Sequence, residues 1–391
     1  MAKKTFVEVV LLARTGLNPR DNFKLGNGKN KYITIKNIHN NEIIIDENTD
    51  VVDDKALELI HKRSQIKKGD ILFCSIGRMG DMYIIPDDPE GWDINESVFA
   101  FTVDTSLVRQ KYFYYVFKNR DTIEYLSKNS SGSTFKSIKM NQLKKMVFDL
   151  PSLEEQDTIV SVLDRLSSAI QMREQELACL DNLIKARFVE LFGEFKINDK
   201  GWKIAEFTDC ASIDTNMIHD FAGYENYPHI GIDSIEKDTG RLVGYRTIAE
   251  DGVISGKYLF TPNHLIYSKI RPNLNKVAMP DFEGLCSADA YPILVKNGVC
   301  TREFFCYVLR SQFFLDYIMA FSNRTNLPKV NKNQVEGFCL PLPDYSVQMD
   351  FSKFVKQVDK SKVIERLFED IFLTLRSRSI ARRLTQSKVV A

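Results

Sequence analysis

The chain has 391 residues, which is enough for two or more domains with their own hydrophobic cores. Hydrophobic residues make up 44% of it and charged residues 27%, the composition expected of a soluble globular protein. The net charge of +1 excludes a strongly basic nucleic-acid-binding chain, and no apolar run approaches the roughly 18 residues that a membrane span needs, so we expect no membrane partner.

The cysteines favour a reducing environment. Seven of them are scattered along the chain, and no two form a C-x-x-C pair. In a protein of this size such spacing predicts reduced, mostly buried thiols and a cytoplasmic location. The five histidines do not gather beside them, so we expect no metal site in this chain.

The first 150 residues are predicted to form a mixed α+β region. The segments "KYITIKNI", "EIIID" and "GDILFCSI" carry strand signals, while "LGNGKN" and "NSSGS" mark turns. The segment "YFYYVFKNRDTIEYL" (112–126) is predicted as a short helix. Because its aromatic residues recur at helical spacing, we assign them to the core and not to base stacking.

A long helix is predicted to follow, at residues 151–192. In "LPSLEEQDTIVSVL" (150–163), Ser152 and Glu155 form the S-x-x-E pattern of a capping box. Apolar residues then recur at alternating spacings of four and three, the period of a left-handed coiled coil. The predicted seam consists of Ile159, Leu163, Leu166, Ile170, Leu177, Leu180, Ile184 and Leu191.

The second half of the chain repeats the first at an offset of about 192 residues. The segment "DILFCSIGR" (70–78) aligns with "NHLIYSKIR" (263–271), which pairs Ser75 with Ser268 and Arg78 with Arg271. The segments "KYFYYVFKN" and "STFKSIKMNQL" align with "EFFCYVLRS" and "TNLPKVNKNQV", and "LPSLEEQ" returns as "LPDYSVQ". Four matches in the same order indicate an internal duplication, with a second α+β region at 193–343 and a second long helix at 344–391.

The second helix is expected to pair with the first. Its seam is predicted to consist of Phe351, Val355, Val358, Ile364, Leu367 and Ile371, with a change of register after Val358. Residues 151–192 contain four basic and eight acidic residues, whereas residues 344–391 contain ten basic and six acidic ones. These opposite charges favour pairing of the two helices. An antiparallel pair would relate the α+β regions by a pseudo-two-fold axis.

The sequence lacks a recognisable catalytic motif. The segments "GNGKN" and "SGKY" lack the spacing and the hydroxyl of a phosphate-binding loop, and no cluster of His, Cys and carboxylate residues occurs. We therefore predict a protein that is not an enzyme.

Basic and amide side chains recur at matched places in both halves and suggest DNA binding. Lys and Arg neutralise phosphates, and Arg, Asn and Gln can contact base edges in pairs of hydrogen bonds. The candidate DNA-binding residues are Ser75, Arg78, Thr134, Lys136, Lys139, Ser268, Lys269, Arg271, Asn273, Asn275, Lys276, Arg324, Asn326, Lys329 and Lys332. On charge alone, a solvated loop surface is the favoured explanation of these residues, and only their recurrence at matched places in both halves makes DNA binding an equal alternative.

The whole pattern resembles the specificity (S) subunit of type I restriction–modification systems. The resemblance lies in "LPSLEEQDTIVSVLDRLSSAI" and "LPLPDYSVQMDFSKFVKQVDKSK" after the two α+β regions, and in "YPHIGIDSIEKDTGRL" and "LIYSKIRPNLNK" within the second region. It implies an α+β fold with two tandem target recognition domains separated by two long helices that form an antiparallel coiled coil.

The resemblance also implies partners. Each recognition domain would read one half of a bipartite double-stranded DNA target in the bacterial cytoplasm, and the helices would set the spacer and dock two methyltransferase (M) subunits. S-adenosylmethionine would be bound by those subunits. ATP and Mg²⁺ would be bound by endonuclease/translocase (R) subunits, and this chain would hold no cofactor.

Three alternatives remain open from the sequence. The first is the recognition subunit of a type II-like system with fused methyltransferase–nuclease partners. The second is an interaction scaffold that uses a duplicated coiled coil and does not bind DNA. The third is an enzyme with an unrecognised site, which the lack of a catalytic cluster disfavours.

Overall fold

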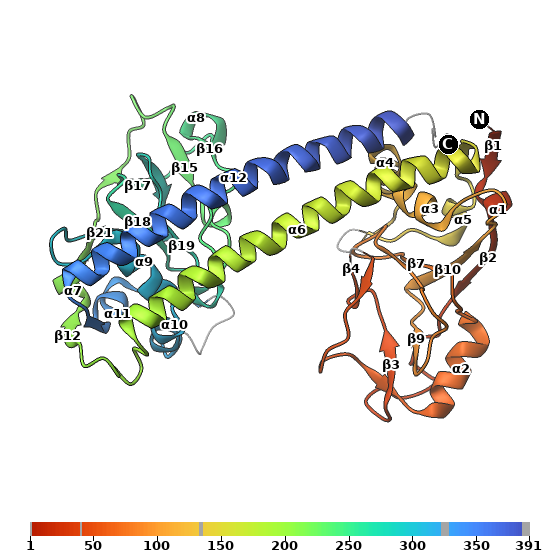
Figure 1. Cartoon of the computed structure of the whole chain (residues 1–391), viewed down its shortest axis with the longest axis horizontal. Coiled ribbons are helices and arrows are strands. Elements are labelled where there is room, and N and C mark those ends of the chain that lie inside the picture. The colour runs from red at the N-terminus through yellow and green to blue at the C-terminus, as the bar shows by residue number, and fades with distance from the viewer. Residues whose placement is uncertain (1, 40, 133–135, 322–327, 385–391) are drawn as a thin grey trace. The chain divides into compact units, whose positions relative to one another are not determined.

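The computed structural model describes residues 2–39, 41–132, 136–321 and 328–384, with the backbone alone for 369–370 and 375–384. The chain divides into two compact units, Met1–Glu174 with Leu367–Ala391, and Gln175–Arg366. Two long helices, α6 (Leu153–Phe192) and α12 (Tyr345–Leu384), each contribute to both units (Figure 1).

The first unit is built on a four-stranded antiparallel sheet. Its strand order is β2 (Val10–Thr15), β10 (Val98–Val103), β7 (Ile71–Cys74), β8 (Met82–Ile84). Helices α3 (Gln110–Phe117) and α4 (Arg120–Lys128) pack on it and bury Phe73, Phe101 and Phe113.

Smaller elements complete this unit. They are β1 (Ala2–Thr5) paired with β11 (Val147–Leu150), β4 (Ile38–His39) with β5 (Glu42–Ile43), and a sheet of β6 (Val51–Val52), β3 (Asn30–Ile33) and β9 (Trp92–Ile94), together with α1 (Phe6–Val9), α2 (Asp54–Ser64) and α5 (Met140–Leu143).

The second unit has the same plan. Its four-stranded sheet has the order β13 (Ala211–Ile213), β21 (Ala290–Val295), β18 (His264–Ser268), β19 (Val277–Ala278). The other strands are β12 (Lys203–Glu206) paired with β22 (Cys339–Leu342), and a sheet of β14 (Met217–Ile218), β17 (Lys257–Phe260), β20 (Gly284–Ser287), β15 (Pro228–Ile230) and β16 (Arg246–Thr247). The helices are α7 (Phe207–Cys210), η1 (Ile232–Ser234), α8 (Ile248–Asp251), η2 (Pro272–Leu274), α9 (Arg302–Arg310), α10 (Gln312–Met319) and α11 (Lys332–Glu336).

Individual hydrogen bonds confirm the internal repeat. The Tyr125 hydroxyl donates to the Gln142 carbonyl at 2.9 Å, and the Tyr317 hydroxyl donates to the Gln334 carbonyl at 3.0 Å, 192 residues later in both donor and acceptor. Among the residues that the structure describes, each unit also contains a parallel strand pair beside its antiparallel ones, β3 with β9 and β15 with β20. The prediction of a duplicated α+β fold is therefore correct.

The start of α6 follows the predicted capping box. The Ser152 amide donates to the Glu155 carboxylate at 2.9 Å, and the Glu155 amide donates to the Ser152 hydroxyl at 3.3 Å. The hydrogen bonds to Ser152 lower the pKa of Glu155, because they favour its charged form. Two of the orphan donors at the helix start are thereby satisfied.

A buried glutamine ties each long helix to its α+β region. Gln156 accepts from the Arg109 amide at 2.8 Å and donates to the carbonyls of Leu107 and Pro151 at 2.9 and 3.0 Å. Gln348 accepts from the Thr301 amide at 2.9 Å and donates to the carbonyls of Val299 and Pro343 at 3.2 and 2.8 Å. This common role explains why glutamine recurs after the Leu-Pro signal; we call the two arrangements the glutamine clamps.

The two long helices run antiparallel within the second unit. Phe351 packs against Phe188 and Phe192 with ring centroids 5.5 and 5.3 Å apart, and further along α12 Lys362 pairs with Asp181 at 2.7 Å. Residue numbers therefore rise on one helix as they fall on the other.

The apolar residues of the predicted seam have three different environments. Ile159 and Leu163 belong to the core of the first unit, and Ile184 belongs to the core of the second. Ile170, Phe351, Val355 and Val358 are also buried, whereas Leu166, Leu177, Leu180 and Leu191 are half-buried. The apolar stripe of α6 therefore packs partly on the α+β regions and not only on α12.

The predicted change of register in α12 is wrong. Ile364, Leu367 and Ile371 are 55%, 61% and 44% exposed. The position four residues after Val358 is Lys362, which is 5% exposed and lies between Asp181 and Asp359. The register continues through a paired lysine, which a search for apolar residues overlooks.

The aromatic residues of "YFYYVFKNRDTIEYL" lie in the core, as predicted. They are on two helices and not one, because α3 ends at Phe117 and α4 begins at Arg120. Tyr112, Phe113 and Phe117 are at most 1% exposed, which leaves no face for stacking on a base.

Candidate nucleic-acid interface

In both units a loop after the third strand of the main sheet meets the segment before a short helix. An isolated bridge joins Ile76 to Ser137 in the first unit and Ile270 to Lys329 in the second. The Gly77 amide donates to the Lys136 carbonyl at 3.2 Å, and the Arg271 amide donates to the Pro328 carbonyl at 2.8 Å. Most of the candidate DNA-binding residues that the structure describes lie on these two loop pairs.

These bonds correct the sequence alignment by one residue. Ile138 donates to the carbonyl of Ser75, and its counterpart Val330 donates to the carbonyl of Lys269, both at 2.9 Å. Ser75 is therefore equivalent to Lys269 and not to Ser268, and Gly77 is equivalent to Arg271. The sequence alignment was wrong by one residue because the turns between equivalent strands differ in length in the two units. Sequence similarity this low does not reveal such differences.

The loop pair of the second unit gathers basic side chains. The Lys329 ammonium lies 3.2 Å from the Asp289 carboxylate, and the Lys269 ammonium lies 5.1 Å from the centre of the Tyr291 ring. Burial, and then the neighbouring charge of Lys329, lower the pKa of Lys269. One carboxylate therefore faces two lysines, and this excess of positive charge suits an anionic ligand.

Arg271 is held in an unusual backbone conformation. Its φ is +49°, in the left-handed region, and its side chain is exposed. The equivalent Gly77 has φ +68°, which costs a glycine little. An arginine pays a steric penalty there, and such strain is commonly found at functional sites.

The candidates of the first unit are more engaged in the protein itself. The Arg78 guanidinium donates to the carbonyls of Ile35 and Lys36 at 3.0 and 2.9 Å, although 45% of its side chain is exposed. The Ser75 hydroxyl is buried and donates to the Ser97 carbonyl at 2.7 Å. Lys136 and Lys139 are exposed and remain accessible to a ligand.

Several candidates of the second unit have structural contacts. The Ser268 hydroxyl donates to Ile270, the Asn275 amide to Arg310 and the Lys276 ammonium to Ile232, all at backbone carbonyls 2.8–2.9 Å away. Lys332 lies 3.6 Å from Glu336, whereas Asn273 is exposed. Thr134, Arg324 and Asn326 lie outside the described residues.

Sequence reasoning missed Lys257, which lies in the "SGKY" segment. Lys257 is 7% exposed, and its ammonium donates to the carbonyl and hydroxyl of Ser255 at 2.9 and 2.7 Å. Burial lowers its pKa, and the charge of Asp289 opposes that shift. Lys257 and Lys269 both interact electrostatically with Asp289, so the fold brings Lys257 near the loop pair of the second unit.

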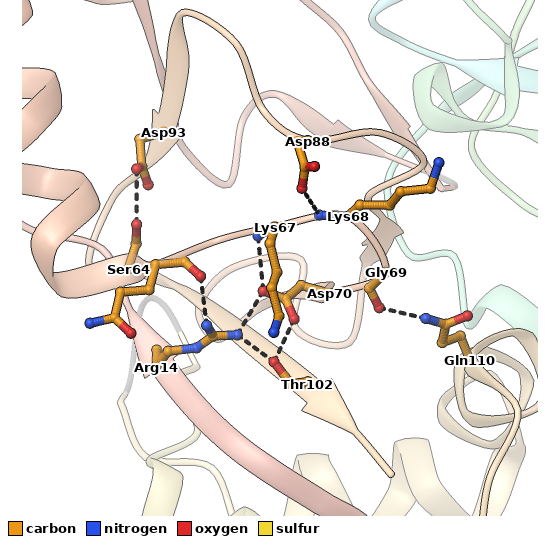
Figure 2. A network of polar contacts seen from close by, with 11 residues as sticks. Arg14, Ser64, Lys67, Lys68, Gly69, Asp70, Asp88, Asp93, Thr102 and Gln110 are labelled. Atoms are coloured by element: carbon orange, nitrogen blue, oxygen red, sulfur yellow. Dashed lines mark hydrogen bonds and ion pairs between the residues drawn. The ribbon is translucent and has the colours of Figure 1, made fainter. Parts of the chain in front are cut away.

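A second polar cluster, in the first unit, is structural. The Arg14 guanidinium donates to the Asp70 carboxylate at 2.7 Å and to the Thr102 hydroxyl at 2.6 Å (Figure 2). Asp70 is fully buried and also accepts from the Thr102 hydroxyl at 2.5 Å. In the second unit the equivalent contact joins Asp214 to His264 at 3.4 Å. The Asp70 carboxylate is fully buried, and the Arg14 and His264 side chains are only 12% and 5% exposed, so we assign these contacts to holding neighbouring strands together.

Within the described ranges, no group of three or more His, Cys, Asp and Glu side chains is arranged to hold a metal ion. Across the same part of the chain, no helix is long and apolar enough to cross a membrane.

Known proteins share both the sequence pattern and the fold. A family model described as "Type I restriction modification DNA specificity domain" matches twice, at residues 4–182 and 194–368. The chain is 30% identical over 293 residues to the type I restriction enzyme EcoDI specificity subunit of Escherichia coli, covering 66% of this chain and 65% of that protein. It is 28% identical over 348 residues to the MjaIX specificity subunit of Methanocaldococcus jannaschii, covering 83% of this chain and 79% of that one.

Two solved structures have a similar fold at low sequence identity. The type I restriction–modification S subunit from M. genitalium superposes with a TM-score of 0.57 at 12% identity, over 98% of this chain and 96% of its own. A chain from a study of complex assembly in a type I system gives a TM-score of 0.50 at 13% identity, over 98% and 97%. With two copies of the specificity domain spanning most of its length, this chain belongs to the type I restriction–modification DNA specificity family.

Proposed function

We propose that this chain is the recognition subunit of a type I restriction–modification complex and reads a bipartite DNA target. Residues 1–150 and 193–343 are the two target recognition domains, and residues 151–192 and 344–391 are the helices that carry them. The observation that supports this most directly is the duplication, since two equivalent folds with equivalent loop pairs suit two half-sites. The family match favours this function over a scaffold that does not bind DNA.

The loop pairs are the proposed DNA-contacting surfaces. Lys269, Arg271 and Lys329 in the second unit, and Lys136 and Lys139 in the first, carry the positive charge that phosphates require. Asn273 and Arg78 have partly or fully exposed side chains that can reach base edges. Because the chain as a whole carries a net charge of only +1, we expect weak and salt-sensitive DNA binding by the chain alone.

Partner subunits supply the chemistry. Two methyltransferase subunits bind S-adenosylmethionine and dock on the long helices, and endonuclease/translocase subunits with ATP and Mg²⁺ complete the complex. Ile364, Leu367 and Ile371 are exposed on α12, which is consistent with a role in docking a partner. The chain itself only positions the DNA, in the bacterial cytoplasm.

The function is tested by mapping methylated adenines across the genome with and without this gene. Loss of methylation at a single two-part motif is the expected result, and an unchanged map would contradict the proposal. Replacing Arg271 and Lys269 together by alanine should affect one half of the motif and leave the other half recognised. Alanine at Lys237 and Lys296, outside the loop pair, is the matched control.

The role of the helices as a spacer ruler has its own test. One heptad, about 10 Å of helix, is inserted in α6 between Ile170 and Leu177, and a matching heptad is inserted in α12. The unread spacer of the motif should lengthen by about three base pairs, since B-DNA rises 3.4 Å per pair. A methylated motif with the original spacer would rule out the ruler.

A further inference from the structure

An ion pair joins each long helix to its α+β region, and its polarity is opposite in the two units. In the first unit the Lys111 ammonium of α3 lies 2.6 Å from the Asp164 carboxylate of α6. In the second unit the Glu303 carboxylate of α9 lies 3.3 Å from the Lys356 ammonium of α12. The helix is therefore acidic in one pair and basic in the other.

The two pairs occupy equivalent positions. The clamp glutamines Gln156 and Gln348 accept from the amides of Arg109 and Thr301. Lys111 and Glu303 each follow two residues after these amides, and Asp164 and Lys356 each follow eight residues after their glutamine. The same contact has thus been kept through the duplication with its charges exchanged.

The surroundings of the pairs differ in exposure. Lys111 and Asp164 are 56% and 35% exposed and line a pocket of about 510 Å³, and the Tyr115 hydroxyl also donates to Asp164 at 2.8 Å. Glu303 is only 8% exposed, while Lys356 is 67% exposed, and both line a pocket of about 720 Å³. Ion pairs open to solvent contribute little to stability. Their main effect is to favour the matched pairing of domain and helix over a pairing that brings like charges together.

We propose that this exchanged ion pair determines which recognition domain can be seated on which helix. The glutamine clamps are alike and would accept either domain. The second domain on α6 would place Glu303 against Asp164, and the first domain on α12 would place Lys111 against Lys356. The mismatch of Glu303 with Asp164 is the more destabilising one. Glu303 is nearly buried, so water cannot replace the interaction with its lost partner.

This inference rests on the repeated fold and not on DNA reading. Its consequence for the family's function is that a new combination of recognition domains is more stable when the ion pair is exchanged as well. Because the test measures stability without DNA, its failure would leave the proposed recognition function untouched.

The test places the second domain on the first helix in the full-length chain. Residues 2–150 are replaced by residues 203–342, since Ala2 pairs with Leu150 in the way that Lys203 pairs with Leu342. The melting temperature is measured for this chimera and for the natural chain, each with and without Asp164→Lys. The matched control is Ser161→Lys, on an exposed position one turn earlier.

The expected outcome is a change of sign. Asp164→Lys should lower the melting temperature of the natural chain by about 2–4 °C and raise that of the chimera by a similar amount. Ser161→Lys should change the melting temperature of the natural chain and of the chimera in the same direction. A shift of the same sign in both backgrounds would overturn the proposal.

If the chimera does not fold, double-mutant cycles in the natural chain test the proposal. In the natural chain, Lys111→Glu and Asp164→Lys are made singly and together, as are Glu303→Lys and Lys356→Glu. Each double variant should recover most of the melting temperature lost by its single variants. Additive losses in both cycles would refute the role of the pairs.

Discussion

The backbone amide of Arg271 donates to the carbonyl of Pro328 at 2.8 Å, which joins the loop after β18 to the segment before α11. This bond is formed with Arg271 at φ +49°, a conformation that glycine adopts in the equivalent position of the first unit. The loop pair thus presents an exposed arginine from a strained backbone.

Replacing Arg271 should separate stability from DNA binding. Arg271→Gly relieves the strain, so the free energy of unfolding should stay the same or rise by up to about 1 kcal/mol. Loss of the guanidinium should weaken DNA binding by about 5- to 150-fold, or about 1–3 kcal/mol, and reduce the salt dependence by about one phosphate contact. Arg271→Ala should weaken binding equally while keeping the strain. Denaturant melts and titrations with duplex DNA at several salt concentrations measure both effects; unchanged binding by both variants would exclude a contact.

Lys269 should make DNA binding dependent on pH. Burial and then Lys329 lower its pKa, while the charges of Asp289 and Cys286 oppose the shift. A phosphate near its ammonium would raise that pKa, so binding would take up a proton wherever Lys269 is partly neutral. Affinity should therefore fall as the pH rises toward 10.5, the ordinary value for lysine. Lys269→Arg should flatten this profile because arginine stays charged; an identical profile for the two proteins would show that Lys269 does not contact phosphate.

The glutamine clamps should contribute to stability in both units. Gln156→Ala leaves the Arg109 amide and the carbonyls of Leu107 and Pro151 without their partner in a buried place. The expected loss in the free energy of unfolding is about 1–3 kcal/mol, and Gln348→Ala should cost the same. Gln171→Ala, on an exposed face of α6, is the control and should change little. Chemical denaturation gives these values, and losses no larger than the control's would contradict the structural role of the clamps.

Glu8 should determine part of the acid sensitivity of the first unit. Its carboxylate accepts from the Thr5 amide at 2.7 Å and the Thr5 hydroxyl at 2.8 Å and pairs with Lys4 at 3.1 Å, which lowers its pKa from 4.5 to about 2. A carboxyl with a depressed folded pKa stabilises fully above its unfolded value, and the contribution disappears as the pH falls from 4.5 through 2. Glu8→Gln should flatten the melting temperature across this window. Glu47→Gln, at another exposed glutamate, should leave the slope as it is; an unaltered slope for Glu8→Gln as well would exclude the contribution.

Local patterns in the sequence were enough to predict the capped start of α6 and the aromatic core. Helix periodicity and capping depend on residues at most four positions apart, and these relationships survive in any fold that contains the segment. The recurrence of Gln156 and Gln348 could be seen in the sequence, although its meaning could not.

Other features depended on contacts between distant residues. The alignment of Ser75 with Ser268, the register of α12 after Val358 and the relevance of Lys257 were wrong or missed, because turn lengths and packing partners decide them. The same holds for the left-handed conformation of Arg271, which is accompanied by a bond to Pro328.

The two ion pairs are the clearest example of a feature that the sequence alone does not predict. In each pair the partners lie 53 residues apart, so no local period relates Lys111 to Asp164 or Glu303 to Lys356. The sequence by itself determined that the chain contains the same module twice, because duplication leaves matched order and spacing. Only the tertiary structure decided that the ion pair between domain and helix has opposite polarity in the two modules. The reason is that the effect of a charge depends on the group that folding places next to it.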